Sequence, residues 1–196
     1  MSIKYIGLDF ETSGTDPWGD SVPIQIGIAT EDDKTFVANI GRWDWNTYTW
    51  SYTSQSIHGI TRETLAAARP VWEVDILAAA WMLETVSGSR MFTIPVGWNV
   101  AGFDRQYITR WMPNLNRILS YRTVDLNAVV FAQATNEQHY KSLKDKSKAY
   151  AAEQIEGETA WHDALYDARA ALHSFNYLRR KEASAKAKGN DTYNIV

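Results

Sequence analysis

The stretch YIGLDFETSG, residues 5–14, combines alternating apolar residues with two acids, and it decides how the chain folds. Successive side chains of a β-strand point to opposite faces of a sheet. The apolar residues of the stretch therefore share one face, which requires a core: Ile6, Leu8 and Phe10. Asp9 and Glu11 point together from the other face, where like charges repel and raise each other's pKa unless a positive partner lies between them. A divalent cation would be such a partner.

The length and composition of the chain predict one soluble domain. With 196 residues, 45% of them hydrophobic, the chain is long enough for one well-packed core and short for two. The sequence has neither an apolar stretch long enough for a membrane helix nor the charged start and short apolar segment of a secretory signal. We therefore expect a soluble cytoplasmic protein that binds no membrane.

The absence of cysteine limits the chemistry. Zero Cys excludes disulfides, thiolate catalysis and Cys-ligated zinc, so a metal has to be held by oxygen or imidazole ligands, which favours Mg²⁺ or Mn²⁺. The net charge of −3 lacks the basic signature of a protein that grips a duplex through many phosphates. Nucleic acid is still a possible substrate, because ions held by carboxylates supply positive charge.

The patterns beyond the first strand predict an α/β domain. Residues 23–30 and 34–40 continue as strands, and together with the first strand they are expected to form a three-stranded antiparallel meander. Short apolar runs at 91–96 and 121–125 fit further, parallel strands that alternate with helices. This order predicts a mixed sheet with helices on both faces.

Two of the expected helices have a defined apolar stripe. The pattern turns helical from Thr61, and the helix after Pro70 is expected to bury Val71, Val74, Leu77, Trp81 and Thr85. A long last helix is expected from about Asp163 to Lys181, and it should bury Ala164, Ala168, Leu172, Phe175 and Leu178.

The domain is expected to cover residues 1–182, and residues 183–196 are expected to form a flexible C-terminal tail. Residues 42–56 are rich in Trp and Tyr, have no clean period, and are expected to be irregular. Aromatic residues of the segment 43–50 can stack on unpaired bases, and they can equally pack the segment against the domain.

Further acids fall where elements begin. Asp104 stands at the start of a helix directly after a strand, and Asp167 lies in the first turns of the last helix. An α/β fold gathers ligands outside the carboxyl ends of its strands, so four carboxylates from three distant segments can converge, enough for a pair of Mg²⁺ or Mn²⁺ ions. His162 precedes Asp167 by five residues, about 140° around an ideal helix. The two can therefore meet only if His162 lies in the loop before the helix.

The segments LDFET, WNVAGFD and HDALYDA resemble the three motifs of the DEDDh, or DnaQ-like, 3′-to-5′ exonucleases, which include polymerase proofreading subunits and ribonuclease T. The resemblance covers residues 3 to about 180 and implies an RNase H-like fold. The matched positions are Asp9, Glu11, Asn99, Phe103, Asp104, His162, Ala164, Asp167 and Ala168. Many proofreading subunits have one residue fewer between the Asn and the Asp of the second motif. This difference in spacing concerns the role implied for Asn99 more than the role implied for Asp104.

The resemblance implies two-metal hydrolysis that releases nucleoside monophosphates from a 3′ end. Asp9 would bridge both ions, Glu11 and Asp167 would complete the ligand set, and Asp104 would bind directly or through water. His162 would accept the proton of the attacking water.

Candidate substrate contacts are Thr12, His58, Asn99 and Phe103. Each has a structural alternative: turn formation for Thr12, a purely structural role for His58, and core packing for Phe103. Trp98 and Phe103 stand next to motif residues and are candidates for a stacking platform under single-stranded bases.

The competing functional classes are a catalytically silent nucleic-acid or polymerase-binding module of the same fold, and an endonuclease of the wider RNase H-like group. The sequence leaves open whether the substrate is DNA or RNA, including an exoribonuclease role in RNA processing. It also leaves open whether a DNA polymerase subunit is a partner.

Overall fold

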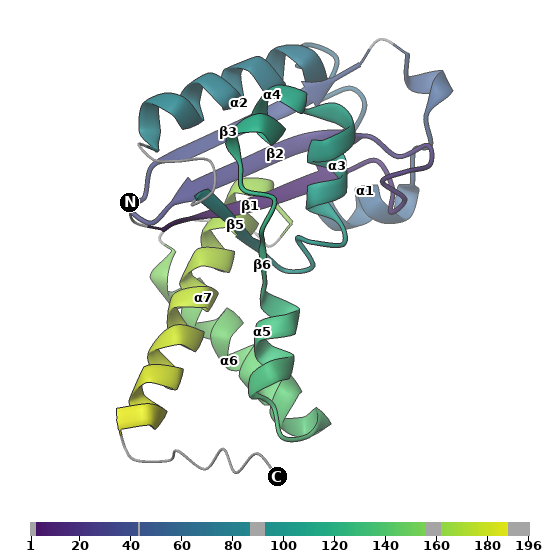
Figure 1. The fold of residues 1–196 in the computed structure, drawn as a ribbon. Coiled ribbons are helices and arrows are strands. Elements are labelled where there is room, and N and C mark those ends of the chain that lie inside the picture. The colour runs from purple at the N-terminus through teal and green to yellow at the C-terminus, as the bar shows by residue number, and fades with distance from the viewer. Residues whose placement is uncertain (1–2, 43, 87–92, 156–161, 188–196) are drawn as a thin grey trace.

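Strand β1 (Lys4–Thr12) lies inside a six-stranded sheet with the order β4-β3-β2-β1-β5-β6 (Figure 1). The chain is described by a computed structural model over residues 3–42, 44–86, 93–155 and 162–187. Three of the strands form the expected antiparallel meander: β1, β2 (Pro23–Thr30) and β3 (Thr35–Gly41). Two more run parallel beyond β1: β5 (Thr93–Gly97) and β6 (Val124–Asp125). The prediction of a mixed sheet is confirmed.

One face of β1 carries the apolar row and packs under three helices. Ile6 and Leu8 are fully buried and Phe10 is 3% exposed. The helices that cover them are α2 (Val71–Thr85), α3 (Asp104–Trp111) and α4 (Pro113–Ile118), which lie together on one side of the sheet in Figure 1. The alternation of side chains along β1 therefore separates the core face from the acidic face as expected.

Helix α7 (Ala164–Ala187) covers the opposite face of the sheet, and α5 (Leu126–Gln133) and α6 (Glu137–Gln154) pack against α7 (Figure 1). The apolar stripe predicted for the last helix is buried at every position: Ala164, Ala168, Leu172, Phe175 and Leu178. Helix α7 continues to Ala187, past the expected end at Lys181. The first residues of the expected tail are therefore helical, and residues 188–196 lie outside the described residues.

Two glycines let α7 approach the sheet closely. A Cβ on Gly7 would collide with the backbone carbonyl of Ala168, and a Cβ on Gly27 would collide with the backbone of Ala164. Gly27 pairs with Asp9 across β1 and β2. The first turn of α7 is consequently held beside the acidic face of β1.

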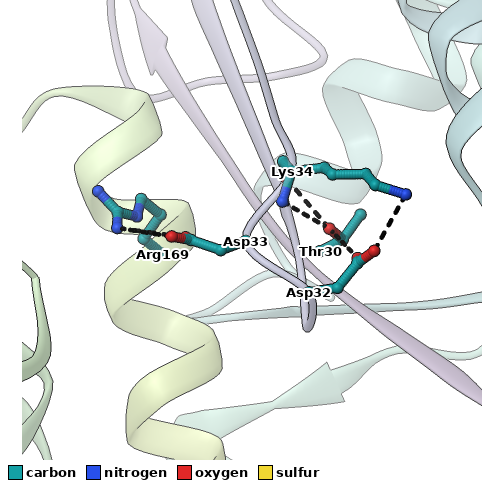
Figure 2. Close-up of polar contacts among 5 residues, drawn as sticks. All are labelled: Thr30, Asp32, Asp33, Lys34 and Arg169. Carbon is teal, nitrogen blue, oxygen red and sulfur yellow. Dashed lines mark hydrogen bonds and ion pairs between the residues drawn. The ribbon is translucent and has the colours of Figure 1, made fainter.

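The turn between β2 and β3 also reaches α7 (Figure 2). Asp33 has a φ of 62°, and its carboxylate lies 3.2 Å from Nη2 of Arg169 on α7. Within the turn, Thr30 Oγ1 donates to Asp32 Oδ1 at 2.6 Å and Lys34 Nζ lies 3.0 Å from Asp32 Oδ2. These polar contacts hold the turn in shape and connect it to the helix that carries Asp167.

The stripe predicted for α2 is wrong in part. The helix begins at Val71, after turns and the two-residue strand β4 (Arg69–Pro70), rather than near Thr61. Val74 is buried as expected, but Leu77 is 41% exposed. The other residues buried on this helix are Asp75, Ala78, Ala79 and Met82. The large side chains had suggested a different face, whereas the buried face of α2 includes two alanines.

The aromatic segment is more ordered than expected. It contains the 3₁₀ turn η1 (Trp45–Thr47) and helix α1 (Tyr52–His58), which begins where the Ser51 side chain accepts from Ser54 N and ends at Gly59 with a φ of 71°. Its aromatic residues pack around a small core of Val22, Ile24 and Leu65: Trp45, Tyr48 and Trp50. Packing therefore accounts for these three residues, and Trp43 lies outside the described residues.

Among the described residues, none of the helices combines the length and the apolar character needed to cross a membrane.

Candidate active site

The four motif acids come from three segments and meet at one place. Asp9 and Glu11 lie on β1, Asp104 is the first residue of α3, and Asp167 lies in the first turn of α7. Asp104 Oδ1 accepts a hydrogen bond of 2.9 Å from the backbone N–H of Phe10, which ties the start of α3 to β1. Ligand atoms of Glu11, Asp167 and His162 lie within 4.8 Å of one another.

Burial raises the pKa of every carboxyl in this group, and repulsion within the group adds to the shift for Asp9, Glu11 and Asp104. Burial raises the pKa of Glu11 to about 8, with repulsion from Asp167 and Asp104 adding to it. Burial also raises the pKa of Asp104 to about 8, although the N–H of Phe10 acts in the opposite direction. The pKa of Asp9 is raised well above its usual value by burial and then by Asp104, Asp167 and Glu11. The group therefore strongly favours a bound cation or bound protons at neutral pH.

Asp167 has one oxygen with a partner and one without. Its Oδ2 accepts from the backbone N–H of His162 at 3.0 Å, whereas its Oδ1 is buried and has no hydrogen-bond partner among the described residues. An unpaired buried carboxylate oxygen is costly unless something positive binds it. Burial raises the pKa of Asp167, and the His162 N–H opposes this shift. A set of carboxylate oxygens with one imidazole nearby fits the ligand preferences of Mg²⁺ and Mn²⁺.

His162 lies in the loop directly before α7. Its φ of 73° turns the backbone so that its own N–H reaches Asp167. The side chain is exposed to solvent and stays within ligand distance of Glu11 and Asp167. Asp163, the next residue, accepts at Oδ1 from the N–H groups of Leu165 and Tyr166, so it caps the helix rather than entering the acid group.

Gln25 is a positioning residue that the sequence reasoning missed. It lies opposite Glu11 in the β1–β2 pair and is 8% exposed. Its Oε1 accepts from the N–H of Ala164 at 2.9 Å, and its Nε2 donates to Asn39 Oδ1 at 3.0 Å. Gln25 thus satisfies one of the free N–H groups at the start of α7. A polar residue in the otherwise apolar strand PIQIGIAT was the signal that could have identified it.

Two of the candidate substrate contacts lie near the acids. Thr12 is buried and its Oγ1 donates to the carbonyl of Gly14 at 2.7 Å, which matches the turn-forming alternative. His58 ends α1, and its Nδ1 accepts from Ile60 N at 3.0 Å. Burial lowers the pKa of His58, the Thr12 backbone raises it, and His162 lowers it further. His58 is therefore placed between the first strand and the loop of His162.

The other two candidates shape the loop before α3. Asn99 is exposed with a φ of 62°, and its carbonyl accepts from the N–H groups of Gly102 and Phe103. Phe103 is half-buried and packs edge to face on Tyr107, with ring centroids 5.1 Å apart. The second motif therefore sets the entry into α3, and core packing explains Phe103.

Comparisons with known proteins agree with this geometry, although no model of a protein family matches the chain. The chain is 23% identical to the oligoribonuclease of Halorhodospira halophila over 194 residues, which cover 90% of this chain and 92% of that protein. It is 22% identical to the oligoribonuclease of Bordetella pertussis over 189 residues, covering 90% of this chain and 93% of that protein.

The solved structures that it resembles are also exonucleases. E. coli exonuclease I in complex with a dT13 oligonucleotide matches with a TM-score of 0.67 at 20% identity, over 96% of this chain and 43% of that one. A 3′-exonuclease in a structure of 3′-end-specific recognition of histone mRNA stem-loop matches with a TM-score of 0.58 at 16% identity, over 91% of this chain and 64% of that one. The chain thus spans less than half of exonuclease I. The predicted RNase H-like fold is confirmed.

Proposed function

We propose that this chain, a member of the DEDDh family of 3′-to-5′ exonucleases, releases nucleoside monophosphates from single-stranded or frayed 3′ ends of nucleic acid. The observation that carries the proposal is the meeting of four acids from three remote segments, with Asp167 Oδ1 buried and without a partner among the described residues. A silent binding module would have no need to maintain such a costly group of like charges.

The acids are suited to hold two Mg²⁺ or Mn²⁺ ions. Asp9, Glu11 and Asp167 would be direct ligands, and Asp104 would act through the oxygen that the Phe10 N–H does not occupy or through water. When bound, the ions would supply the Lewis acidity and the positive charge that hydrolysis of a phosphodiester requires. The carboxylates fix where that charge lies, because β1 and the two helix starts hold them rigidly.

His162 is proposed to take the proton from the attacking water. An imidazole is suited to accept a proton near neutral pH, and this one is both exposed to solvent and within 4.8 Å of ligand atoms on Glu11 and Asp167. The hydrogen bond from its backbone N–H to Asp167 holds the loop, so the ring can move without displacing the backbone.

The substrate class is a 3′ end of DNA or RNA. The relatives named above include two oligoribonucleases, an exonuclease with a dT13 oligonucleotide and a 3′-exonuclease that recognises histone mRNA. These names favour a single-stranded 3′ terminus and leave DNA and RNA as equal alternatives, including an exoribonuclease role. They give no support to a DNA polymerase subunit as a partner, a question that the sequence left open.

Digestion of 5′-labelled DNA and RNA oligonucleotides tests the proposal. With Mg²⁺ or Mn²⁺ we expect a ladder of products shortened by one nucleotide at a time and released mononucleotides, and we expect EDTA to abolish both. Internal fragments without mononucleotides would indicate an endonuclease. Tight binding without any product would indicate a silent module.

Three variants assign the roles. Glu11→Gln should abolish hydrolysis and the stabilisation of the fold by Mg²⁺, whereas the matched control Glu84→Gln changes an exposed acid on α2 and should alter neither. His162→Ala should lower turnover by a factor on the order of 10²–10⁴ while Mg²⁺ still stabilises the protein. Full activity of His162→Ala would remove the general base from the proposal.

A further inference from the structure

Two lysines of α6 are held beside a tryptophan of the second motif. Trp98 follows β5 directly, and the Nζ atoms of Lys144 and Lys148 lie 5.2 and 5.4 Å from the centre of its ring. The two lysines are one helical turn apart and therefore lie on the same side of α6. A cation over an indole face is attracted by the ring, so Trp98 fixes both ammonium groups in one place.

This lysine pair borders the acidic site. Lys148 and His162 line one open hollow of about 390 Å³, together with Asp145, Ala149 and Ala152. Lys148 and Asp167 are close enough for each to act on the pKa of the other. The hollow therefore lies between the proposed general base and one side of α6.

The two ammonium groups are close to each other as well. Lys144 donates to Asn127 Oδ1 at 3.1 Å, which fixes its position from α5. Burial lowers the pKa of Lys148, and repulsion from Lys144 acts in the same direction. Asp167 and Asp145 act on the pKa of Lys148 in the opposite direction. An anion placed between the two ammonium groups would further offset their mutual repulsion.

We propose that Lys144 and Lys148, held over Trp98, form a phosphate-binding subsite for the strand upstream of the 3′-terminal linkage. The inference rests on the proposed exonuclease function and adds a substrate contact to it. A strand whose terminal phosphate lies at the acids has to pass its next phosphates over the neighbouring surface, where Lys148 places a positive charge on the wall of the hollow and Asp145 is the acid of the same wall. Contacts to phosphates position a strand without reading its sequence.

This assignment changes the role expected for Trp98. An ammonium group over the indole covers a face that a stacked base would need, so the ring acts through the lysines instead of as a stacking platform. The phosphate contact is then expected to serve DNA and RNA alike, because the phosphate is the same in both.

Equilibrium binding tests the subsite without hydrolysis. The fluorescence anisotropy of a 5′-labelled single-stranded oligonucleotide would be measured in EDTA over a range of salt concentrations, for the whole chain and for Lys148→Gln. The slope of log K against log salt should become less steep by about 0.7, the contribution of one phosphate contact on a single strand. The matched control is Lys146→Gln, which removes an exposed lysine about 200° around the same helix and should leave the slope unchanged.

Uncharged linkages identify the contact directly. Oligonucleotides with a single methylphosphonate at the first, second or third linkage upstream of the terminal one would be compared with the unmodified strand. For one of these positions the loss of affinity should be present in the wild type and absent in Lys148→Gln. Equal losses in both proteins at all three positions, or equal salt slopes, would overturn the subsite. Since these measurements need no turnover, they remain decisive even if the chain releases no mononucleotide, which would instead refute the proposed function.

Discussion

Replacing Gln25 by Met tests whether the hydrogen bond from the start of α7 to this residue of the sheet positions the helix. Met keeps the length of the side chain but removes the acceptor for the Ala164 N–H, a donor on a residue that is fully buried. Leaving a buried N–H unpaired costs about 1–3 kcal/mol, so the free energy of unfolding should fall by that amount. The first turn of α7 carries Asp167, and the residue His162 lies just before it. Because the first turn of α7 would no longer be tied to the sheet, we expect the activation barrier to rise by about 1.4 kcal/mol, which corresponds to a kcat about tenfold lower.

Chemical unfolding and steady-state exonuclease kinetics would measure the two effects separately. The control is Asn39→Ala, which removes the exposed partner of Gln25 Nε2 and leaves the bond to α7 in place. We expect it to change the unfolding free energy by less than about 0.5 kcal/mol and to leave kcat unaltered. If Gln25→Met unfolded with the expected loss but retained the wild-type kcat, the bond would be structural only, and the argument that it positions the catalytic loop would be wrong.

Three other predictions follow from burial in the structure. The pKa of Glu11 and of Asp104 is raised to about 8, so the folded chain binds more protons than the unfolded chain between about pH 4 and pH 8. Without metal, the stability of the fold should therefore decrease as the pH rises through that window. Thermal unfolding scans should show that Mg²⁺ makes this decrease smaller. Gly27→Ala should lower the free energy of unfolding by about 1–3 kcal/mol and remove most of the activity, because the added Cβ would collide with the backbone of Ala164. An unchanged melting temperature would contradict this. Asp75 is buried and accepts three hydrogen bonds from the start of α4. Asp75→Ala should therefore lower the free energy of unfolding by about 1–3 kcal/mol for each buried donor left unpaired, while the residual folded protein keeps its specific activity.

Local periodicity was sufficient to predict the central layers of the fold. The side-chain alternation in β1 separates apolar from acidic residues whatever surrounds the strand, and the stripe of α7 is long and regular enough to define one buried face. The stripe of α2 failed because size and burial differ there: Leu77 is exposed, whereas Ala78 and Ala79 are buried. A sequence pattern weighted by large apolar residues cannot show that a helix buries its small ones.

The acids of the site could be anticipated, but the residues that position them could not. Asp9, Glu11, Asp104 and Asp167 stand at element boundaries, where ligands of α/β folds gather. Gln25 acts on a helix that begins 139 residues later in the chain, and no local pattern connects such positions. The same holds for Trp98 and its lysines, which the fold brings together from the end of β5 and from α6. Contacts of this kind depend on tertiary structure and require coordinates.

The arrangement of charge explains how a chain with a net charge of −3 can act on a polyanion. The four acids of the site have raised pKa values that favour bound protons or cations, so at neutral pH the site repels a strand less than its composition implies. Positive charge lies next to it on Lys144 and Lys148, fixed over Trp98. The attraction between a strand and the site depends on the charges next to the site more than on the net charge of the chain, because ions in solution screen charges that are more than about 8–10 Å apart. A few fixed cations beside a metal-dependent site can therefore hold a 3′ end that the whole surface would not attract.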